Sequence, residues 1–477
     1  MSKLTFLGAI EGVTGSMYLL ETEQSKVLLD CGLFQGRREE EAANLRPLPF
    51  DVSTIDAVVL SHAHLDHSGR LPLLVKEGYG GPIHMTQPTK ELIAILLKDA
   101  ASLQERDAEW ENRRRRRSGK PEIEPLYTMD EVDLALSLCK GKRYHRTFAV
   151  TPDVDVTFAD AGHILGSAIV QLDIREGGQT KKLVFSGDLG NSQAALLRDP
   201  EIVGEADVLL LESTYGDRDH KSMEETLAEF EQVLEEASRN GGNILIPSFA
   251  VGRTQEIIFR LGELYQKGKL PHQAIYLDSP MAIAVTKVYD AHQEVYSEED
   301  LDAIEDAATE ACAPDNPLCS ENLRTFLPTL RFTEATEDSM ALNKISSGAI
   351  IIAGSGMCNG GRIRHHLKHN LWRQQSHVIF VGFQAMGTPG RAIIDGATSV
   401  RMAGEEIAVK AAIHTLGGFS AHASQTQLLD WLSHFEKSRP QLFLVHGEAG
   451  AKQALKEAAQ QRGWDSTIPE LGQTIHF

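Results

Sequence analysis

Three histidines and an aspartate crowd into one short segment near the N-terminus. The segment Ser61-His62-Ala63-His64-Leu65-Asp66-His67 directly follows an apolar stretch that reads as a buried strand. Imidazole nitrogens and carboxylate oxygens are ligands for zinc and similar divalent metals. Four such residues in a tight loop cannot all reach one ion without strain, so we expect them to divide between two ions. The alternative, a histidine-rich surface loop, fits the density of these residues poorly.

A metal site needs more ligands than one loop supplies. His163 in DAGHILGS and Asp188 in VFSGDLG each lie in a turn of small residues at the end of a predicted strand. Taken alone, either residue is more often a cap or turn residue. The first cluster makes both of them candidate ligands. Asp30 in VLLDCG also follows a strand, and we expect it to orient a ligand histidine from behind.

The elements around these residues change in character along the chain. Up to about residue 204 the pattern predicts mostly strands, with a long helix from Pro88 to Arg117 that ends in five arginines, Arg113–Arg117. From residue 207 to 391, fully apolar strands alternate with amphipathic helices. This alternation is typical of a parallel α/β sheet covered on both faces. Residues 392–477 again read as strands and helices.

At these residues the sequence resembles a known family. His62-Ala63-His64-Leu65-Asp66-His67 matches the H-x-H-x-D-H signature of the metallo-β-lactamase superfamily, and Asp30, His163 and Asp188 match its other motif positions in order. Three further segments resemble the motifs of the β-CASP branch, with Glu212 in LLLESTYGDR, His422 in GFSAH and His446 in LFLVHGE. The chain resembles the bacterial and archaeal ribonucleases related to the endonuclease that cleaves pre-mRNA 3′ ends.

The resemblance implies both a fold and a ligand set. The fold would be α/β: an αββα sandwich built from residues 1–206 and 392–477, with a β-CASP domain inserted at residues 207–391. One zinc would be held by His62, His64 and His163, and the second by Asp66, His67 and His446, with Asp188 bridging the two; Mn²⁺ is a possible substitute. In this family, RNA-directed members carry a histidine at the position of His446, which favours single-stranded RNA as the partner.

The chemistry of such a site can be argued independently. Two divalent ions can clamp an anionic phosphodiester and lower the pKa of a water, so hydrolysis would leave a 5′-phosphate and a 3′-OH. The leaving oxygen needs a proton, for which His422 is a suitable general acid and Glu212 a suitable partner to orient it. We expect Asp66 to be one of the catalytic residues as well as a metal ligand. The plainer alternatives are a capping role for Glu212 and a helix-terminal role for His422. Internal cleavage and 5′-exonuclease action both stay open.

Three glycine-rich segments follow predicted strands of the inserted domain and could contact phosphate. They supply Ser248 and Arg253 in SFAVGRTQE, Ser355 in GSGMCNGGR and Arg391 in FQAMGTPGR. The alternative is that these segments are only tight turns. The Arg113–Arg117 run could touch RNA, although a solvated helix end is the commoner explanation.

Composition bounds the remaining possibilities. Lys and Arg number 47 against 67 Asp and Glu, a net charge of −20, so any RNA binding should be local and metal-dependent. Five scattered cysteines without a C-x-x-C pair, no secretory signal and no long apolar run favour a reduced, cytoplasmic protein without a membrane segment. A homodimer is plausible on frequency alone. The competing functions are a hydrolase of a small ester or thioester, a DNA nuclease, a redox diiron protein and a catalytically dead scaffold.

Overall fold

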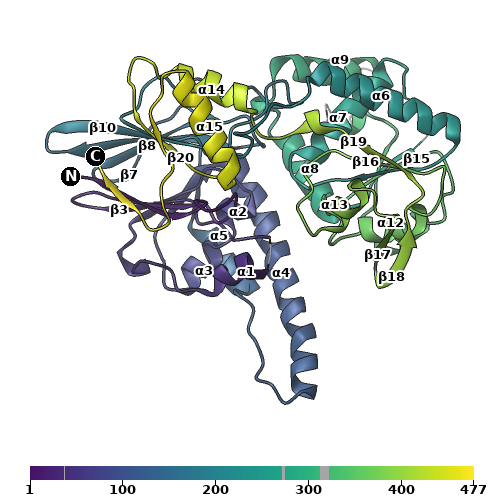
Figure 1. The fold of residues 1–477 in the computed structure, drawn as a ribbon, viewed down its shortest axis with the longest axis horizontal. Coiled ribbons are helices and arrows are strands. Elements are labelled where there is room, and N and C mark those ends of the chain that lie inside the picture. The colour runs from purple at the N-terminus through teal and green to yellow at the C-terminus, as the bar shows by residue number, and fades with distance from the viewer. Residues whose placement is uncertain (37, 271–273, 312–321) are drawn as a thin grey trace. The chain divides into compact units, whose positions relative to one another are not determined.

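The computed structural model describes residues 1–36, 38–270, 274–311 and 322–477. The chain forms two compact units. Unit 1 comprises residues 1–192, 199–219 and 422–477, and unit 2 comprises residues 193–198 and 220–421. Unit 2 is thus inserted into the sequence of unit 1, as the colour progression in Figure 1 shows. Cys31, Cys139 and Cys358 are buried free thiols, and Cys312 and Cys319 lie outside the described residues.

Unit 1 contains two seven-stranded sheets. The first has the order β22-β1-β2-β3-β4-β5-β6, and the second has the order β21-β20-β11-β10-β9-β8-β7. The strands of the first sheet are β1 (Lys3–Gly8), β2 (Met17–Glu21), β3 (Lys26–Leu29), β4 (Ala57–Val59), β5 (Ile83–Thr86), β6 (Cys139–Lys142) and β22 (Thr474–His476). Those of the second are β7 (Phe148–Thr151), β8 (Val154–Asp160), β9 (Ala168–Glu176), β10 (Gln179–Phe185), β11 (Val208–Leu211), β20 (Gln441–Leu444) and β21 (Ser466–Thr467).

The two sheets pack face to face through a shared apolar core. Alternating residues of β1, such as Leu4 and Phe6, point into this core, as the period of two in a strand requires. Aromatic rings join the sheets directly: Phe6 of β1 lies 5.2 Å from Phe443, and Tyr18 of β2 lies 5.2 Å from Phe185. The packing of these buried rings fixes the position of one sheet relative to the other, and with it the positions of their strand ends.

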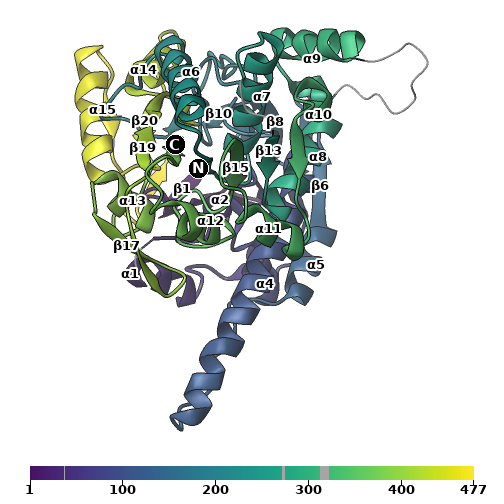
Figure 2. The ribbon, with the colours of Figure 1, turned by 90° about the vertical axis from the view of Figure 1, so that its right-hand side faces the viewer.

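Helices cover the outer faces of the sandwich. α14 and α15 bury Leu428, Leu432 and Leu455 against the second sheet. α4 packs on β5 and β6 of the first sheet and then extends well beyond it (Figures 1 and 2). No described helix combines the length and the apolar composition that crossing a bilayer requires. The helices of unit 1 are α1 (Arg38–Glu41), α2 (Leu65–Ser68), α3 (Leu71–Lys76), α4 (Gln87–Arg117), α5 (Met129–Leu138), α14 (Gln425–Ser433) and α15 (Ala449–Gln461).

Unit 2 is built on a parallel sheet of order β14-β13-β15-β12-β16-β19. Its strands are β12 (Ile244–Pro247), β13 (Ala274–Leu277), β14 (Leu330–Phe332), β15 (Ala349–Ala353), β16 (His377–Phe380) and β19 (Ala412–Thr415), beside a hairpin of β17 (Ser399–Met402) and β18 (Glu405–Ala408). Its helices are α6 (Met223–Asn240), α7 (Arg253–Gln266), α8 (Pro280–Ala291), α9 (Glu298–Ala311), α10 (Leu323–Phe326), α11 (Thr336–Leu342), α12 (Ile363–Asn370) and α13 (Pro389–Ile394). The expected α/β class, a two-sheet sandwich with an inserted parallel α/β domain, is confirmed.

Two strands lie in a different unit from the one that the sequence pattern suggested. We placed the strand around 208–211 at the start of the inserted domain, but β11 pairs with β10 and β20 in the sandwich. It is apolar throughout because the core covers one of its faces and α14 and α15 cover the other. Conversely, we assigned residues 412–415 to the tail, but β19 is the edge strand beside β16 in unit 2.

Candidate metal centre

The ends of parallel strands bring the candidate residues of unit 1 together. β3 and β4 run parallel in the first sheet, and β10, β11 and β20 run parallel in the second. Parallel strands present their carboxyl ends at one edge. Asp30 follows β3, the segment 60–67 follows β4, and Asp188, Glu212 and His446 follow β10, β11 and β20. His163 joins them from the connection between β8 and β9.

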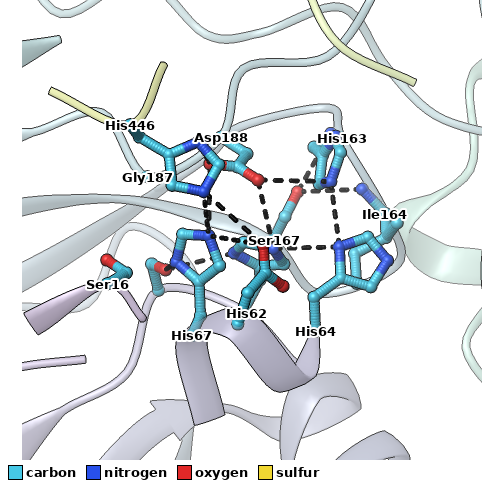
Figure 3. Close-up of polar contacts among 12 residues, drawn as sticks. Ser16, His62, His64, His67, His163, Ile164, Ser167, Gly187, Asp188 and His446 are labelled. Atoms are coloured by element: carbon cyan, nitrogen blue, oxygen red, sulfur yellow. Dashed lines mark hydrogen bonds and ion pairs between the residues drawn. The ribbon is translucent and has the colours of Figure 1, made fainter. Parts of the chain in front are cut away.

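One group of four residues converges around the side chain of His64 (Figure 3). Nδ1 of His64 lies 3.1 Å from Nε2 of His62 and 3.1 Å from Nε2 of His163. Oδ2 of Asp188 lies 3.5 Å from Nε2 of His62 and 3.7 Å from Nε2 of His163. All four ligand atoms are therefore close enough to hold a single ion.

A second group converges around His67 and His446, whose Nε2 atoms lie 3.1 Å apart (Figure 3). Oδ2 of Asp66 lies 3.5 Å from Nε2 of His446 and 3.9 Å from Nε2 of His67. The other carboxylate oxygen of Asp188, Oδ1, lies 3.3 Å from Nε2 of His67. Asp188 thus presents one oxygen to each group.

These side chains fit a divalent metal better than they fit one another. Oδ1 of Asp188 is buried and accepts no hydrogen bond from the described residues. Two imidazole nitrogens about 3.1 Å apart cannot both carry protons, so at least one nitrogen of each pair has a free lone pair. These lone pairs point to the same place as the buried carboxylate oxygens. Histidine and carboxylate are also the donor set that zinc accepts. The expected residues thus form groups that could each hold a metal ion.

Asp30 supports the second group from behind. Its Oδ2 lies 2.6 Å from Nδ1 of His67, and it also accepts hydrogen bonds from the hydroxyls of Ser16 (2.9 Å) and Ser61 (3.0 Å). The backbone N–H of Ser61 donates to Oδ1 at 2.8 Å. Because Nδ1 of His67 faces this carboxylate, its Nε2 is left to face the second group.

Burial and the neighbouring charges shape the protonation of the site. Burial lowers the pKa of His62 and of His64, and for His62 the neighbouring His67 lowers it further. Burial also opposes charge on Asp66, but His67 and His446 outweigh it and hold the pKa of that carboxyl at about 2. Carboxylates of Asp188, Asp30 and Asp66 outweigh burial at His67 and raise its pKa.

Glu212 and His422 form a pair beside this centre. Oε1 of Glu212, which is fully buried, lies 3.3 Å from Nδ1 of His422. The Glu212 carboxylate is held by backbone N–H groups of Leu189 (2.8 Å) and Thr214 (3.0 Å). His422 is 21% exposed, so its ring reaches solvent while Glu212 fixes its inner edge. Burial lowers the pKa of His422, but the Glu212 carboxylate outweighs it and raises that pKa overall.

Sequence reasoning overlooked several hydroxyl groups around the ligands. Thr214 lies 3.2 Å from Nδ1 of His446 through its Oγ1, and Ser167 accepts the backbone N–H of His163 at 3.0 Å. Ser16 and Ser61 hold Asp30. Thr214 and Ser61 lie within the quoted motifs, so their position was a usable signal. Ser16 lies far from any motif, and no signal in the sequence singles it out.

The four predicted phosphate contacts all lie in unit 2. Ser248 is buried and accepts the hydroxyl of Thr254 at 3.0 Å, and Ser355 donates to Asn359 at 2.8 Å. Arg253 is buried and its guanidinium pairs with Glu256. Arg391 pairs with Asp395 at 2.9 Å. Ser355 and Arg391 remain accessible, whereas Ser248 and Arg253 are already engaged within the fold.

The arginine run lies at the end of α4 in unit 1. Arg113, Arg114 and Arg115 pair with glutamates of the same helix, and Arg116 pairs with Glu122. These ion pairs are exposed and contribute little stability, but they neutralise most of the local positive charge. The arrangement is that of a solvated helix end.

Known protein families and individual proteins resemble this chain over most of its length. Family models match the chain as metallo-β-lactamase superfamily at residues 10–235, as Beta-Casp domain at residues 254–393, and as Zn-dependent metallo-hydrolase RNA specificity domain at residues 406–469. Ribonuclease TTHA0252 of Thermus thermophilus is 40% identical over 98% of both chains. Transcription termination factor FttA of Methanocaldococcus jannaschii is 30% identical over 94% of this chain and 67% of its own length. A protein of unknown function from Enterococcus faecalis, 14% identical, shares the fold over 99% of both chains, with a TM-score of 0.55.

The chain belongs to the β-CASP family of the metallo-β-lactamase superfamily. It is a metal-dependent nuclease, which confirms the expected class of enzyme and leaves no support for the scaffold and redox alternatives.

Proposed function

We propose that this enzyme hydrolyses the phosphodiester bonds of single-stranded RNA with two zinc ions and leaves a 5′-phosphate and a 3′-OH. The observation that carries the proposal is Asp188, which turns one oxygen toward His62 and His163 and the other toward His67. A carboxylate shared in this way suits two ions held side by side. The name of the 40% identical ribonuclease and the RNA specificity domain at residues 406–469 support RNA over DNA.

The two groups would each hold one ion. His62, His64 and His163 would bind the first, Asp66, His67 and His446 the second, and Asp188 both. Bound zinc would supply the positive charge that neutralises a phosphodiester and activates water. Asp30 holds Nδ1 of His67, so that Nε2 of that ring would be the nitrogen that binds the second ion.

The remaining requirement is a proton for the leaving group. As the oxygen of water loses a proton to solvent and forms a bond to phosphorus, the bond from phosphorus to the 3′ oxygen breaks, and that oxygen takes a proton. His422 is the group we assign to donate it, because its ring is partly exposed beside the ligands while Glu212 contacts its Nδ1. Its other nitrogen, Nε2, is then the donor. The buried Glu212 acts as the positioning residue for this histidine.

The assignment can be tested with single-stranded RNA and DNA labelled at either end. The wild-type chain should cleave RNA, and Asp188→Ala and His422→Ala should each lower kcat at least about 100-fold. His365→Ala removes an exposed histidine outside the site and is the matched control. Comparing the two labels separates internal cleavage from 5′-exonuclease action. Hydrolysis of a small ester without cleavage of either polymer would contradict the proposal.

Metal content tests the number of ions separately. The wild-type chain should bind two zinc ions, and His64→Ala and His446→Ala should each bind fewer than two with measurably weaker retention of one. A wild-type chain that saturates at a single zinc ion would contradict the two-ion proposal while leaving a metal-dependent nuclease intact. The cytoplasmic location and the homodimer stay predictions.

A further inference from the structure

Three loops of unit 2 meet at the carboxyl edge of its parallel sheet. They follow β12, β15 and β16 and are tied together by backbone contacts. The side chain of Gln384, which is buried, donates from Nε2 to the carbonyl oxygens of Gly356 (2.8 Å) and Phe383 (3.1 Å). The N–H of Gly390 donates to the carbonyl oxygen of Met357 at 3.3 Å. The N–H of Ser248, after β12, donates to the carbonyl oxygen of Ala353 in β15 at 3.1 Å, so the three segments are braced against one another.

Large apolar side chains stand out from this surface. Phe249 is 43% exposed, Phe383 is 53% exposed and Met386 is 74% exposed. The ring of Phe249 packs directly on Gly356, where an added Cβ would lie only 2.8 Å from it. Thr254 fixes the backbone of Phe249 by donating to its carbonyl oxygen at 2.6 Å. Exposed aromatic rings gathered on neighbouring loops are typical of a binding surface.

Donor groups without partners lie in the loop after β15 and in α13, which follows the loop after β16. Arg391 contacts Asp395 through Nε alone, at 2.9 and 3.0 Å, and among the described residues no partner contacts its Nη groups. Asn359, which is exposed, accepts a hydrogen bond at Oδ1 from Ser355, and its amide N–H₂ has no partner within the described chain. A cation and an amide donor on the segments that follow the same parallel strands as the apolar rings match the phosphate and the base of a nucleotide.

We propose that Phe249, Phe383 and Met386 form a stacking surface for unpaired bases of single-stranded RNA, with Arg391 contacting a phosphate. The proposal rests on the RNA-directed function proposed above and names the residues of unit 2 that would bind that substrate. Two rings and one thioether bury the face of one or two bases but offer too little area for a stable protein interface. Stacking on aromatic rings tolerates any base, so this surface would give affinity without sequence preference.

The test measures equilibrium binding of a fluorescent single-stranded RNA to the full chain carrying His422→Ala, so that cleavage does not interfere. Adding Phe383→Ala should weaken binding about 5- to 100-fold, the loss expected for one stacked base. Phe383→Tyr keeps an aromatic face and should stay within about twofold of the parent chain. Trp372→Ala is the matched control, because Trp372 is an equally exposed aromatic residue (51%) that precedes β16 at the other end of the strand.

Two further measurements identify what the ring contacts. An oligomer with one abasic position should bind the parent chain less tightly, and Phe383→Ala should add nothing to that loss at the position it stacks on. Arg391→Gln should make the salt dependence of binding shallower by about one phosphate contact.

The proposal is overturned if Phe383→Ala binds RNA like Trp372→Ala, or if its loss is the same for intact and fully abasic oligomers. It is also overturned if Phe383→Ala leaves RNA affinity unchanged and instead abolishes self-association in sedimentation, which would make the surface a protein contact. Because binding is measured without turnover, a wild-type chain that binds RNA through these residues but does not cleave it would refute the proposed function alone.

Discussion

His84 provides a sharp test of how burial controls charge in this protein. The residue lies in β5, is 6% exposed, and neither ring nitrogen has a hydrogen-bond partner among the described residues. Its ring packs 5.3 Å from that of Phe148. Burial, and then the nearby Lys142 and Lys140, lower its pKa from 6.5 to about 4. The folded chain therefore binds this proton more weakly than the unfolded chain does.

The consequence is a loss of stability in acid that one substitution should remove. Because the pKa of this histidine is lower in the folded chain, the free energy of unfolding has its full value above pH 6.5 and decreases as the pH falls toward 4. With these two pKa values, linkage gives a loss of about 2 kcal/mol between pH 8 and pH 5. His84→Leu carries no titrating ring, so its free energy of unfolding should fall by about 2 kcal/mol less than that of the wild type over the same interval.

Urea denaturation of both chains at pH 8 and pH 5, at one zinc concentration, measures this difference. The comparison cancels the acid sensitivity of the metal-site histidines, which both chains share. His365→Leu, at an exposed histidine, should follow the wild type at both pH values. If the gap between His84→Leu and the wild type is the same at pH 8 and pH 5 within about 0.5 kcal/mol, the reasoning is wrong.

Three further substitutions probe buried carboxylates. Asp278→Asn should lower the free energy of unfolding, measured by urea denaturation, by about 3–5 kcal/mol, because the buried carboxylate pairs with Arg362 (2.7 Å) and His366 (2.6 Å). Its control is Glu405→Gln, at an exposed ion pair, which should lower that free energy by less than about 1 kcal/mol. Burial raises the pKa of Asp290 to about 6 from 3.8, so its ionisation destabilises the fold as pH rises; Asp290→Asn should be up to about 3 kcal/mol more stable than wild type at pH 8 and equal to it near pH 3. Asp30→Asn should weaken zinc retention about 10- to 100-fold in competition with a chelator, and an unchanged affinity would remove its orienting role.

Much of the fold was predictable because periodicity and caps agree with tertiary structure. The amphipathic helix before Gly241 is α6, which ends at Asn240 where Gly241 adopts a positive φ of 72°. The long helix of residues 88–117 is α4. The pairing partners of β11 and β19 were not predictable, because an apolar strand looks the same in either parallel sheet. Only the registers of β11 with β20 and of β19 with β16 distinguish them.

The candidate site shows a similar division. Strand ends and motif order predicted which residues converge, and the distances around Asp188 agree with that expectation. Contacts between residues that are distant in sequence but close in the folded chain could not be predicted from the sequence. Ser16 lies under Asp30 because β2 pairs with β3, and Arg253 is occupied by a glutamate one helical turn away. The side chain of His366 in α12 is buried against Asp278, which follows β13.

The position of unit 2 within the sequence has a consequence for biosynthesis. The residues that complete unit 1 begin again at His422, and β22 at Thr474–His476 pairs with β1 at Lys3–Gly8. A ribosome must therefore translate the whole of unit 2 before the first sheet can close and before His446 can meet His67. The complete set of candidate ligands therefore cannot assemble before residue 446 has been translated.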